Sequence, residues 1–296
     1  MRGAKPEASI EQRIERDGVI RRGDRVAIAC SGGADSVALV HALASLRRSL
    51  ELQLSIVHVN HGTRESAWQD ECVVLRIGAA FGLAVRVVPL EGDRHDEAAL
   101  REARYGALVE QAREAGAHVI ATAHHQEDQS ETVLLALLRG AGPDGLAGMR
   151  ARRPLAAGID LARPLLRVPS EELRRVCHAH ALPYAVDPTN ADRGLRRNAL
   201  REALDALRPL FPGLDAAVAR TAEVLTEERA GTQRADLRRE VRAALAAQES
   251  LQDVDFVHVE AAVRALERGG SGRFHMKKGV ELRIERGAIV KTEGRR

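Results

Sequence analysis

A short run of small and polar residues follows an apolar stretch near the start of the chain: Ser31, Gly32, Gly33, Ala34, Asp35 and Ser36. Adjacent glycines let a backbone approach a ligand closely, and free N–H groups at the start of a following helix favour an anion. Ser31 and Ser36 add hydroxyl donors, whereas Asp35 suits the site when Mg²⁺ bridges it to phosphate oxygens. The run therefore predicts a phosphate-binding loop, with Asp35 as candidate magnesium ligand. The alternative is a tight turn in which Asp35 or Ser36 caps the helix.

Polar residues also follow two later apolar runs. His58 and Asn60 end the first of them, and His124 and Asp128 follow the second. Because His124 and Asp128 are four residues apart, a helix beginning near residue 125 would place them on neighbouring turns. Such a pair can help to hold Mg²⁺ and phosphate or orient a reacting group. The alternatives are a simple turn at Asn60, helix capping at residues 124–125, or a zinc pair that has no evident third ligand.

The elements that carry these residues alternate along the first half of the chain. Apolar runs predict strands at 25–30, 54–59, 84–90 and 117–122. Helical spacing of apolar residues predicts helices at 35–46, 66–81, 97–115 and 126–139. This order predicts an α/β fold, a doubly wound parallel sheet with helices on both faces. With strand order 3-2-1-4-5, all these polar residues would surround one crevice at the carboxyl ends of the strands.

The rest of the chain is less regular. We predict a loop at 140–154, an extended segment at 159–166, a helix at 169–180, and a strand with a turn at 183–190. Prolines interrupt the chain after residue 208, a charged helical stretch follows at 214–249, and 279–290 alternates like a hairpin around Arg286-Gly287. We therefore predict a catalytic domain over 1–208 and a small, mainly helical domain over 209–296.

Composition limits the class of protein. The three cysteines never form a C-x-x-C pair, which argues against a disulfide framework or a cysteine-ligated metal centre. Neither a signal peptide nor an apolar run long enough for a membrane span is visible, so we expect a cytoplasmic protein. The net charge of +3 and the pI of about 9.0 permit a nucleic-acid partner.

The segment SGGADS, placed directly after a strand, resembles the PP-loop of the ATP pyrophosphatase superfamily. Three further segments, HVNHGTR, TAHHQEDQSETVLLALLRGAGPDGLAGM and DPTNADRGLRRN, follow in order, so that residues 24–201 resemble tRNA(Ile)-lysidine synthases of the short form. The resemblance implies an ATP-dependent ligase that forms a carbon–nitrogen bond. L-lysine would be joined to C2 of the wobble cytidine of tRNA(Ile) through an adenylated intermediate, with ATP as co-substrate and Mg²⁺ as cofactor.

The resemblance also implies roles for single residues. Arg104, His124, Asp128 and Arg197 would surround the triphosphate and the target base, and Asp128 is one candidate for the general base. This chain departs from the usual pattern in having Glu127 where an aspartate is typical, Thr63 where leucine is common, and no tyrosine near Gly194-Leu195. These departures concern the base pocket.

Basic residues near the site are candidate tRNA contacts, with a solvated surface as the alternative reading: Arg150, Arg152, Arg153, Arg193, Arg196, Arg197 and Arg201. The rival functions are another PP-loop enzyme, which would thiolate tRNA or ligate a small molecule, and a non-catalytic ATP-binding protein. Paired cysteines for sulfur insertion are absent from the sequence. The sequence leaves open the lysine-binding residues and whether the protein forms a homodimer.

Overall fold

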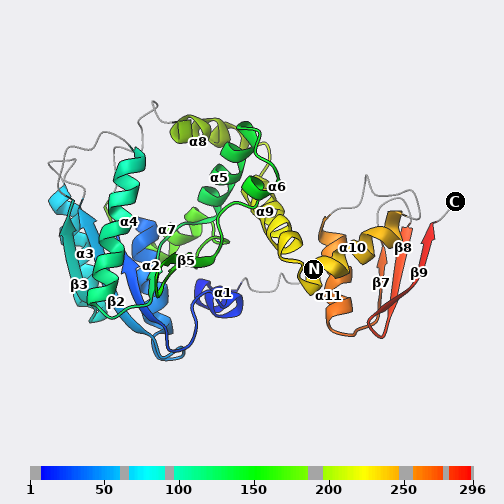
Figure 1. The fold of residues 1–296 in the computed structure, drawn as a ribbon, viewed down its shortest axis with the longest axis horizontal. Coiled ribbons are helices and arrows are strands. Elements are labelled where there is room, and N and C mark those ends of the chain that lie inside the picture. The colour runs from blue at the N-terminus through cyan, green and yellow to red at the C-terminus, as the bar shows by residue number, and fades with distance from the viewer. Residues whose placement is uncertain are drawn as a thin grey trace. The chain divides into compact units, whose positions relative to one another are not determined.

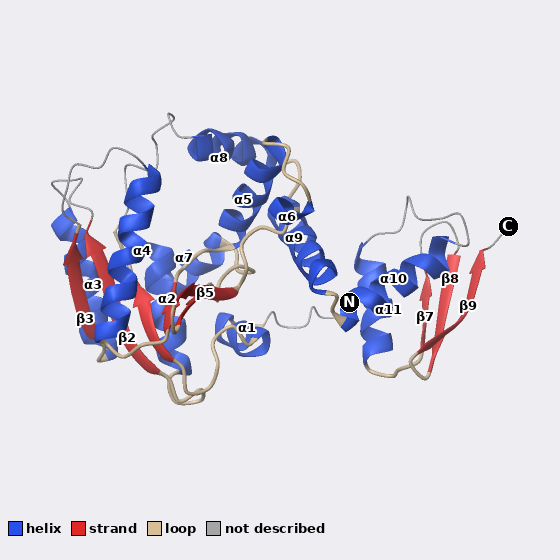
Figure 2. Cartoon of the chain, in the orientation of Figure 1, coloured by secondary structure: helices blue, strands red, loops and turns tan. Residues whose placement is uncertain are grey.

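The computed structural model describes residues 8–60, 67–90, 97–185, 196–246, 256–275 and 280–294 (Figures 1 and 2). Contacts divide the chain into two compact units, 1–220 and 221–296. Residues 209–220, which we predicted to open the second domain, group with the first unit. There Asp215 accepts hydrogen bonds from Ser130 and from Arg208.

The first unit is built on a six-stranded sheet in the order β3-β2-β1-β4-β6-β5. The strands are β1 (Arg25–Ala29), β2 (Gln53–Asn60), β3 (Ala84–Pro89), β4 (Val119–Ala121), β5 (Arg152–Ala156) and β6 (Ile159–Ala162). All neighbours are parallel except β5, which pairs antiparallel with β6. The predicted order is confirmed, with β6 as the fifth strand. β5 begins inside the predicted loop 140–154 and extends past it. It was not predicted because this edge strand, with two arginines and Pro154, carries no apolar run and tolerates a missing N–H.

The described part of the first unit contains eight complete helices: α1 (Ile10–Asp17), α2 (Ala34–Leu46), α3 (Ala67–Phe81), α4 (Glu97–Glu114), α5 (Gln126–Leu138), α6 (Pro143–Leu146), α7 (Ser170–Ala179) and α8 (Arg196–Leu207). The helices predicted before residue 180 are confirmed within a few residues. The prediction omitted α1, α6 and α8. For α1 the sequence did carry a signal, a capping box in which Ser9 and Gln12 satisfy each other's backbone N–H groups.

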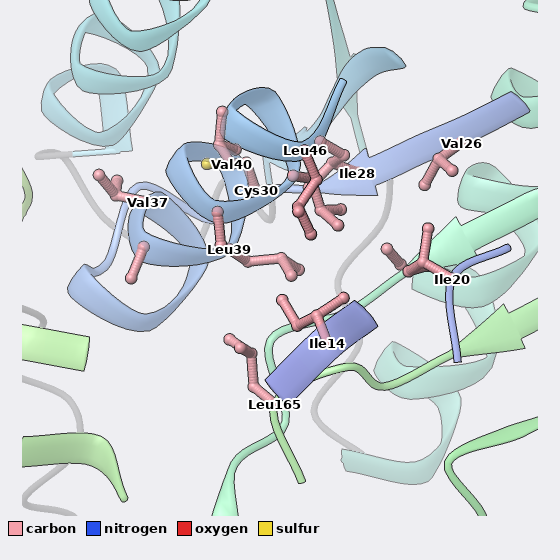
Figure 3. Packing of buried hydrophobic residues seen from close by; sticks show 14 of the residues in the cluster. Ile14, Ile20, Val26, Ile28, Cys30, Val37, Leu39, Val40, Leu46 and Leu165 are labelled. Carbon is pink, nitrogen blue, oxygen red and sulfur yellow. The ribbon is translucent and has the colours of Figure 1, made fainter. Parts of the chain in front are cut away.

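Alternation along the strands separates the core into two layers. On β1, Val26 and Ile28 join the cluster that contains α1, α2, α3 and α7, while Ala27 joins the cluster that contains α4. Figure 3 shows Ile28, Val37 and Leu39 in the first cluster, to which α2 contributes most of its apolar side chains. The carboxyl ends of β1 and β4 are thereby held between two packed layers, so residues that follow them are positioned by a rigid support.

Arg152, a predicted tRNA contact, instead joins β5 to the sheet. Its guanidinium donates to Asp24 (NH1 to Oδ2, 2.8 Å) and to Asp160 (Nε to Oδ2, 2.9 Å). Asp24 is 5% exposed and also accepts from the Arg21 N–H. Burial raises the pKa of Asp24, but the hydrogen bonds from these donors and from His118 lower it by more. The pKa of Asp24 therefore lies below its ordinary value. Arg152 is therefore a structural residue.

We expect Asp24→Asn to lower the free energy of unfolding by about 1–3 kcal/mol at pH 7, since the variant loses charge-assisted hydrogen bonds. A carboxyl whose pKa is depressed by folding stabilises the fold above its unfolded pKa of about 3.9, and this contribution is lost as the pH falls through the folded pKa. The difference in the free energy of unfolding between Asp24→Asn and the unsubstituted protein should therefore shrink below about pH 4. Urea unfolding followed by circular dichroism checks this, with the exposed Asp236→Asn as control; a difference that persists at low pH contradicts it.

The second unit contains the end of α9 (Leu214–Ala230), α10 (Gln233–Ala246), α11 (Phe256–Glu267) and an antiparallel sheet of β7 (Gly272–His275), β8 (Val280–Glu285) and β9 (Ala288–Gly294). The hairpin predicted around Arg286-Gly287 is present as β8 and β9. The helix predicted over 214–249 is interrupted at Gly231, which has a positive φ of 57°. The prediction did not include α11 and β7.

The core of the second unit combines apolar and ionic contacts. Val263, Leu282 and Ile284 are buried between the helices and the sheet. Arg238, only 2% exposed, pairs with Glu260 and Glu227 and so joins the three helices of this unit. Among the residues described in both units, no helix has the length and apolar character needed to cross a bilayer.

Candidate active site

A cavity of about 970 Å³ opens in the first unit at the carboxyl ends of β1 and β4. Seven of the predicted site residues line it: Ser31, Gly33, Asp35, Ser36, Arg104, His124 and Asp128. Gly32, Ala34, His58, Asn60 and Arg197 do not line it. Segments far apart in the sequence thus meet at one place, as expected for the carboxyl edge of a doubly wound sheet.

Gly32 lets the loop pass close to α3. Its φ is +91°, a conformation that favours glycine, and a Cβ built there would lie 3.0 Å from the Asp70 carbonyl oxygen. The loop is further closed by the Ser36 hydroxyl, which donates to the Gly33 carbonyl at 2.8 Å, while the Ser31 and Ser36 hydroxyls lie 3.3 Å apart. The turn is therefore fixed before any ligand arrives.

The start of α2 presents backbone donors at this turn. The first i→i−4 hydrogen bond of α2 runs from the Val37 N–H to the Gly33 carbonyl (3.0 Å), so the N–H groups of residues 34–36 come before it. Gly33 is the N-cap and has no side chain with which to cap them. This geometry suits a phosphate group, which would accept hydrogen bonds at the positive end of the helix dipole.

Asp35 lies on the first turn of α2, and its two carboxylate oxygens have different surroundings. Its Oδ2 lies 3.6 Å from His125 Nε2, whereas Oδ1 is buried without a hydrogen-bond donor in the described residues. Burial, and next the charge of Asp128, raise the pKa of Asp35 against the opposing pull of His125. A cation at this carboxylate would supply the missing partner.

The acidic residues here fit Mg²⁺ that is shared with phosphate. Both Asp35 Oδ2 and Asp128 Oδ2 face the same ring nitrogen, His125 Nε2, at 3.6 and 3.5 Å. No group of three or more histidine, cysteine or acidic side chains within the described ranges is arranged to hold a metal by itself. Mg²⁺ typically takes one or two carboxylates and completes its shell with water and substrate phosphates, which matches this pair.

His125, which we had considered only as a cap or zinc ligand, is the N-cap of α5. Its N–H donates to Asp128 Oδ2 at 3.1 Å, and its Nδ1 lies 2.9 Å from Glu127 Oε2. Burial lowers the pKa of His125, but the surrounding carboxylates raise it more. His125 rather than His124 is therefore the histidine that contacts Asp128.

His124 precedes α5 and is held differently. Its Nδ1 lies 2.9 Å from the Thr122 hydroxyl. Burial and then Arg163, Arg101 and Arg104 lower the pKa of His124 to about 3. The ring is thus neutral near pH 7, and Nδ1, not Nε2, is the nitrogen that faces Thr122.

Arg197 contacts two acidic residues of α5 that line the cavity, Asp128 and Glu131. Its Nε donates to Glu131 Oε2 (2.7 Å) and its NH2 to Asp128 Oδ1 (3.2 Å), while Arg201 Nε donates to Glu131 Oε1 (2.8 Å). The side chain of Glu131 is 1% exposed. Glu131 was not among the predicted site residues, although its i,i+3 spacing from Asp128 indicates that both share one helix face.

Arg104 reaches the cavity beside Tyr105. The guanidinium carbons of Arg101 and Arg104 lie 5.2 and 5.6 Å from the centre of the Tyr105 ring, within the range of a cation–π contact. Tyr105, Arg201, Arg174 and Arg208 also line the cavity. The cavity therefore has acidic residues at the phosphate loop and several arginines around them.

His58 and Asn60 have contacts that support the strands. His58 is 3% exposed, and its Nδ1 lies 2.8 Å from the Cys30 carbonyl oxygen. The Asn60 carbonyl accepts the Leu90 N–H at 2.8 Å. The rest of that segment, 61–64, and residues 187–195 with Arg193 lie outside the described residues.

Comparison with known proteins shows the family to which the chain is similar. The sequence model of the PP-loop domain family matches residues 5–207. A tRNA(Ile)-lysidine synthase of Ralstonia nicotianae is 44% identical over 208 residues, which are 68% of this chain and 45% of that protein. The corresponding enzyme of Salinispora tropica is 45% identical over 77% of this chain and 70% of its own length.

Coverage differs among these relatives. A tRNA(Ile)-lysidine synthase of Alkalilimnicola ehrlichii is 42% identical over 76% of this chain and 53% of its own length, so the chain spans about half the length of several curated relatives. Among solved structures, the U34-tRNA thiolase NcsA from Methanococcus maripaludis superposes with a TM-score of 0.63 at 18% identity, over 74% of this chain and 78% of that one. That likeness concerns the fold.

Proposed function

Since the chain belongs to the PP-loop family and, within it, to the tRNA(Ile)-lysidine synthases, we propose that it joins L-lysine to C2 of the wobble cytidine of tRNA(Ile) at the expense of ATP. The observation that carries the proposal is the phosphate loop, which meets an acidic pair and Arg104 in a single cavity. This combination suits an enzyme that polarises the phosphates of ATP more than one that only stores a nucleotide.

In the proposed reaction the C2 oxygen of the cytidine attacks the α-phosphate of ATP, and pyrophosphate leaves. The ε-amine of lysine then attacks C2, the C2–oxygen bond breaks, and AMP leaves. The N–H groups at the start of α2 and the guanidinium of Arg104 are placed to hold the phosphates and to stabilise charge that develops on them.

Asp35 and Asp128 would hold Mg²⁺, which when bound neutralises charge on phosphate oxygens. The ring of His125 faces both carboxylates through Nε2. His124 stays neutral, and the ring nitrogen that does not face Thr122 is available for a hydrogen bond with a substrate. We assign these roles as part of the proposal.

The attacking amine must lose a proton, because a free lysine has a pKa near 10.4. Asp128 is the candidate acceptor. Arg197 donates a hydrogen bond to its Oδ1 and so fixes the orientation of this carboxylate. Arg174, Arg201 and Arg208 line the cavity and are candidate contacts for the phosphates of tRNA.

The test is pyrophosphate release from ATP by the purified protein with L-lysine and a tRNA(Ile) transcript carrying a CAU anticodon. Each component is omitted in turn, and a transcript with uridine at the wobble position is the matched control. We expect release that requires the CAU transcript and labelled lysine that enters the RNA. Release that ignores tRNA would point to a small-molecule ligase, and nucleotide binding without release would point to a binding protein.

A further inference from the structure

Glu127 joins two helix starts through one carboxylate. Its Oε1 accepts the Ser170 hydroxyl at 3.0 Å and lies 3.1 Å from the Ser170 N–H, and its Oε2 lies 3.0 Å from the same N–H. The Ser170 N–H belongs to the first turn of α7, so Glu127, from the first turn of α5, caps a different helix. The Glu127 side chain is only 18% exposed.

The same carboxylate fixes the ring of His125. Glu127 Oε2 lies 2.9 Å from His125 Nδ1, on the opposite side of the ring from Nε2. Because an imidazole is rigid, a contact that holds Nδ1 also determines where Nε2 lies, as is known for histidines that are oriented by a second carboxylate. Nε2 is the atom that faces both Asp35 and Asp128.

The helix that Glu127 caps supports the phosphate loop from behind. On α7, Cys177 Sγ lies 3.4 Å from the carbonyl oxygen of Ala34, at the start of α2. After α7, the Ala185 N–H donates to the Gly32 carbonyl at 2.9 Å. The contacts therefore close a ring that runs from the loop through α7 and Glu127 to His125 and back to Asp35.

We propose that Glu127 is a positioning residue, which ties His125 to the N-terminus of α7 and thereby fixes the two carboxylates that face His125. What matters in this role is the length of the side chain, since one carboxylate must reach Ser170 and His125 together. The effect on catalysis rests on the function proposed above. The effect on nucleotide binding is independent of that function, since binding requires neither tRNA nor lysine.

Two variants separate length from charge. Glu127→Asp keeps the charge but is one methylene shorter, so it reaches Ser170 or His125 but not both. Glu127→Gln keeps the length and still accepts the Ser170 N–H, while its amide group stays beside His125. Calorimetry with Mg²⁺ and α,β-methylene-ATP should give a Kd raised at least about tenfold in Glu127→Asp and within about threefold of the unsubstituted value in Glu127→Gln.

The exposed Glu110→Asp on α4 is the matched control, and its Kd should not change. A double-mutant cycle with Ser170→Ala adds a readout that general loss of stability would not move. Removal of the Ser170 hydroxyl should weaken nucleotide binding in the unsubstituted background. It should have little further effect in Glu127→Asp, in which one carboxylate no longer contacts both Ser170 and His125. In the activity assay, Glu127→Asp should raise the KM for ATP more than it lowers kcat.

Three results would overturn the inference. They are a Glu127→Asp variant that binds nucleotide normally, a Glu127→Gln variant as weak as Glu127→Asp, and strictly additive effects with Ser170→Ala. Thermal unfolding shows whether each variant is folded; if Glu127→Asp does not fold, the Ser170→Ala variant alone must still raise the Kd. A protein that binds nucleotide but leaves tRNA unmodified would contradict the proposed function and leave this test intact.

Discussion

Asp35→Asn should lower the rate of pyrophosphate release by about 100-fold or more, because a neutral amide cannot anchor the cation that offsets phosphate charge. Asp35 lies on the first turn of α2, and its buried Oδ1 has no donor in the described part of the chain. The measurement is single-turnover pyrophosphate release with the CAU transcript and saturating ATP. The exposed Asp236→Asn variant should retain the full rate.

The same substitution should raise the thermal midpoint of the ligand-free protein at neutral pH. The pKa of Asp35 is raised in the folded state by burial and by Asp128. A carboxyl whose pKa is raised by folding holds its proton more tightly in the folded state than in the unfolded state. Its ionisation at neutral pH therefore destabilises the fold, and the neutral asparagine removes this cost. Lost activity together with a higher midpoint would exclude misfolding as the cause. Asp35→Asn that keeps near-normal release would remove Asp35 from the proposed mechanism.

Glu131→Ala should cost both stability and activity, because it leaves Arg197 and Arg201 without the buried carboxylate that holds them. Removing one partner of a buried ion pair costs about 3–5 kcal/mol, and we expect about 2–3 kcal/mol here because both arginines are partly exposed. Arg197 would then be held only through Asp128, so the rate of lysine incorporation should fall at least about tenfold. Urea unfolding and labelled-lysine incorporation measure the two effects.

The paired controls are Glu131→Gln and Glu110→Ala. Glutamine preserves the shape and one acceptor, so it should lose less stability than alanine, and the exposed Glu110 should show no effect. If Glu131→Ala kept its activity while losing stability, Arg197 would have no part in the reaction. Unchanged stability would contradict the buried ion pairs themselves.

The sheet and the phosphate loop could be predicted because local sequence determines both. A buried parallel strand is a continuous apolar run, and the loop needs its two glycines for backbone geometry alone, so neither requires knowledge of distant contacts. β5 was missed since its stability comes from pairing with β6 and from Arg152, which contacts Asp24 more than a hundred residues away. A basic residue that is buried in this way looks the same in sequence as one on a tRNA-binding surface.

The candidate site was predicted as a set of motifs but not as a set of contacts. Asp35, Arg104, His124 and Asp128 do line one cavity. Glu127 and Glu131 were not identified as anchors, because their partners Ser170 and Arg201 come from α7 and α8. Adjacent His124 and His125 also could not be told apart from sequence, since the choice depends on where α5 begins. His58 lies near the end of the right strand, yet its ring faces the Cys30 carbonyl oxygen instead of the cavity lining.

The hydrogen bond from the Ala185 N–H to the Gly32 carbonyl means that two segments about 150 residues apart share one local opening reaction. The phosphate loop cannot swing outward without releasing Ala185, and the backbone at Ala185 cannot detach without freeing the loop. A nucleotide that holds the loop closed therefore slows hydrogen exchange at the Ala185 amide, which it does not touch. Occupancy of the nucleotide site is in this way converted into protection of a backbone amide at Ala185, which belongs to a distant part of the sequence.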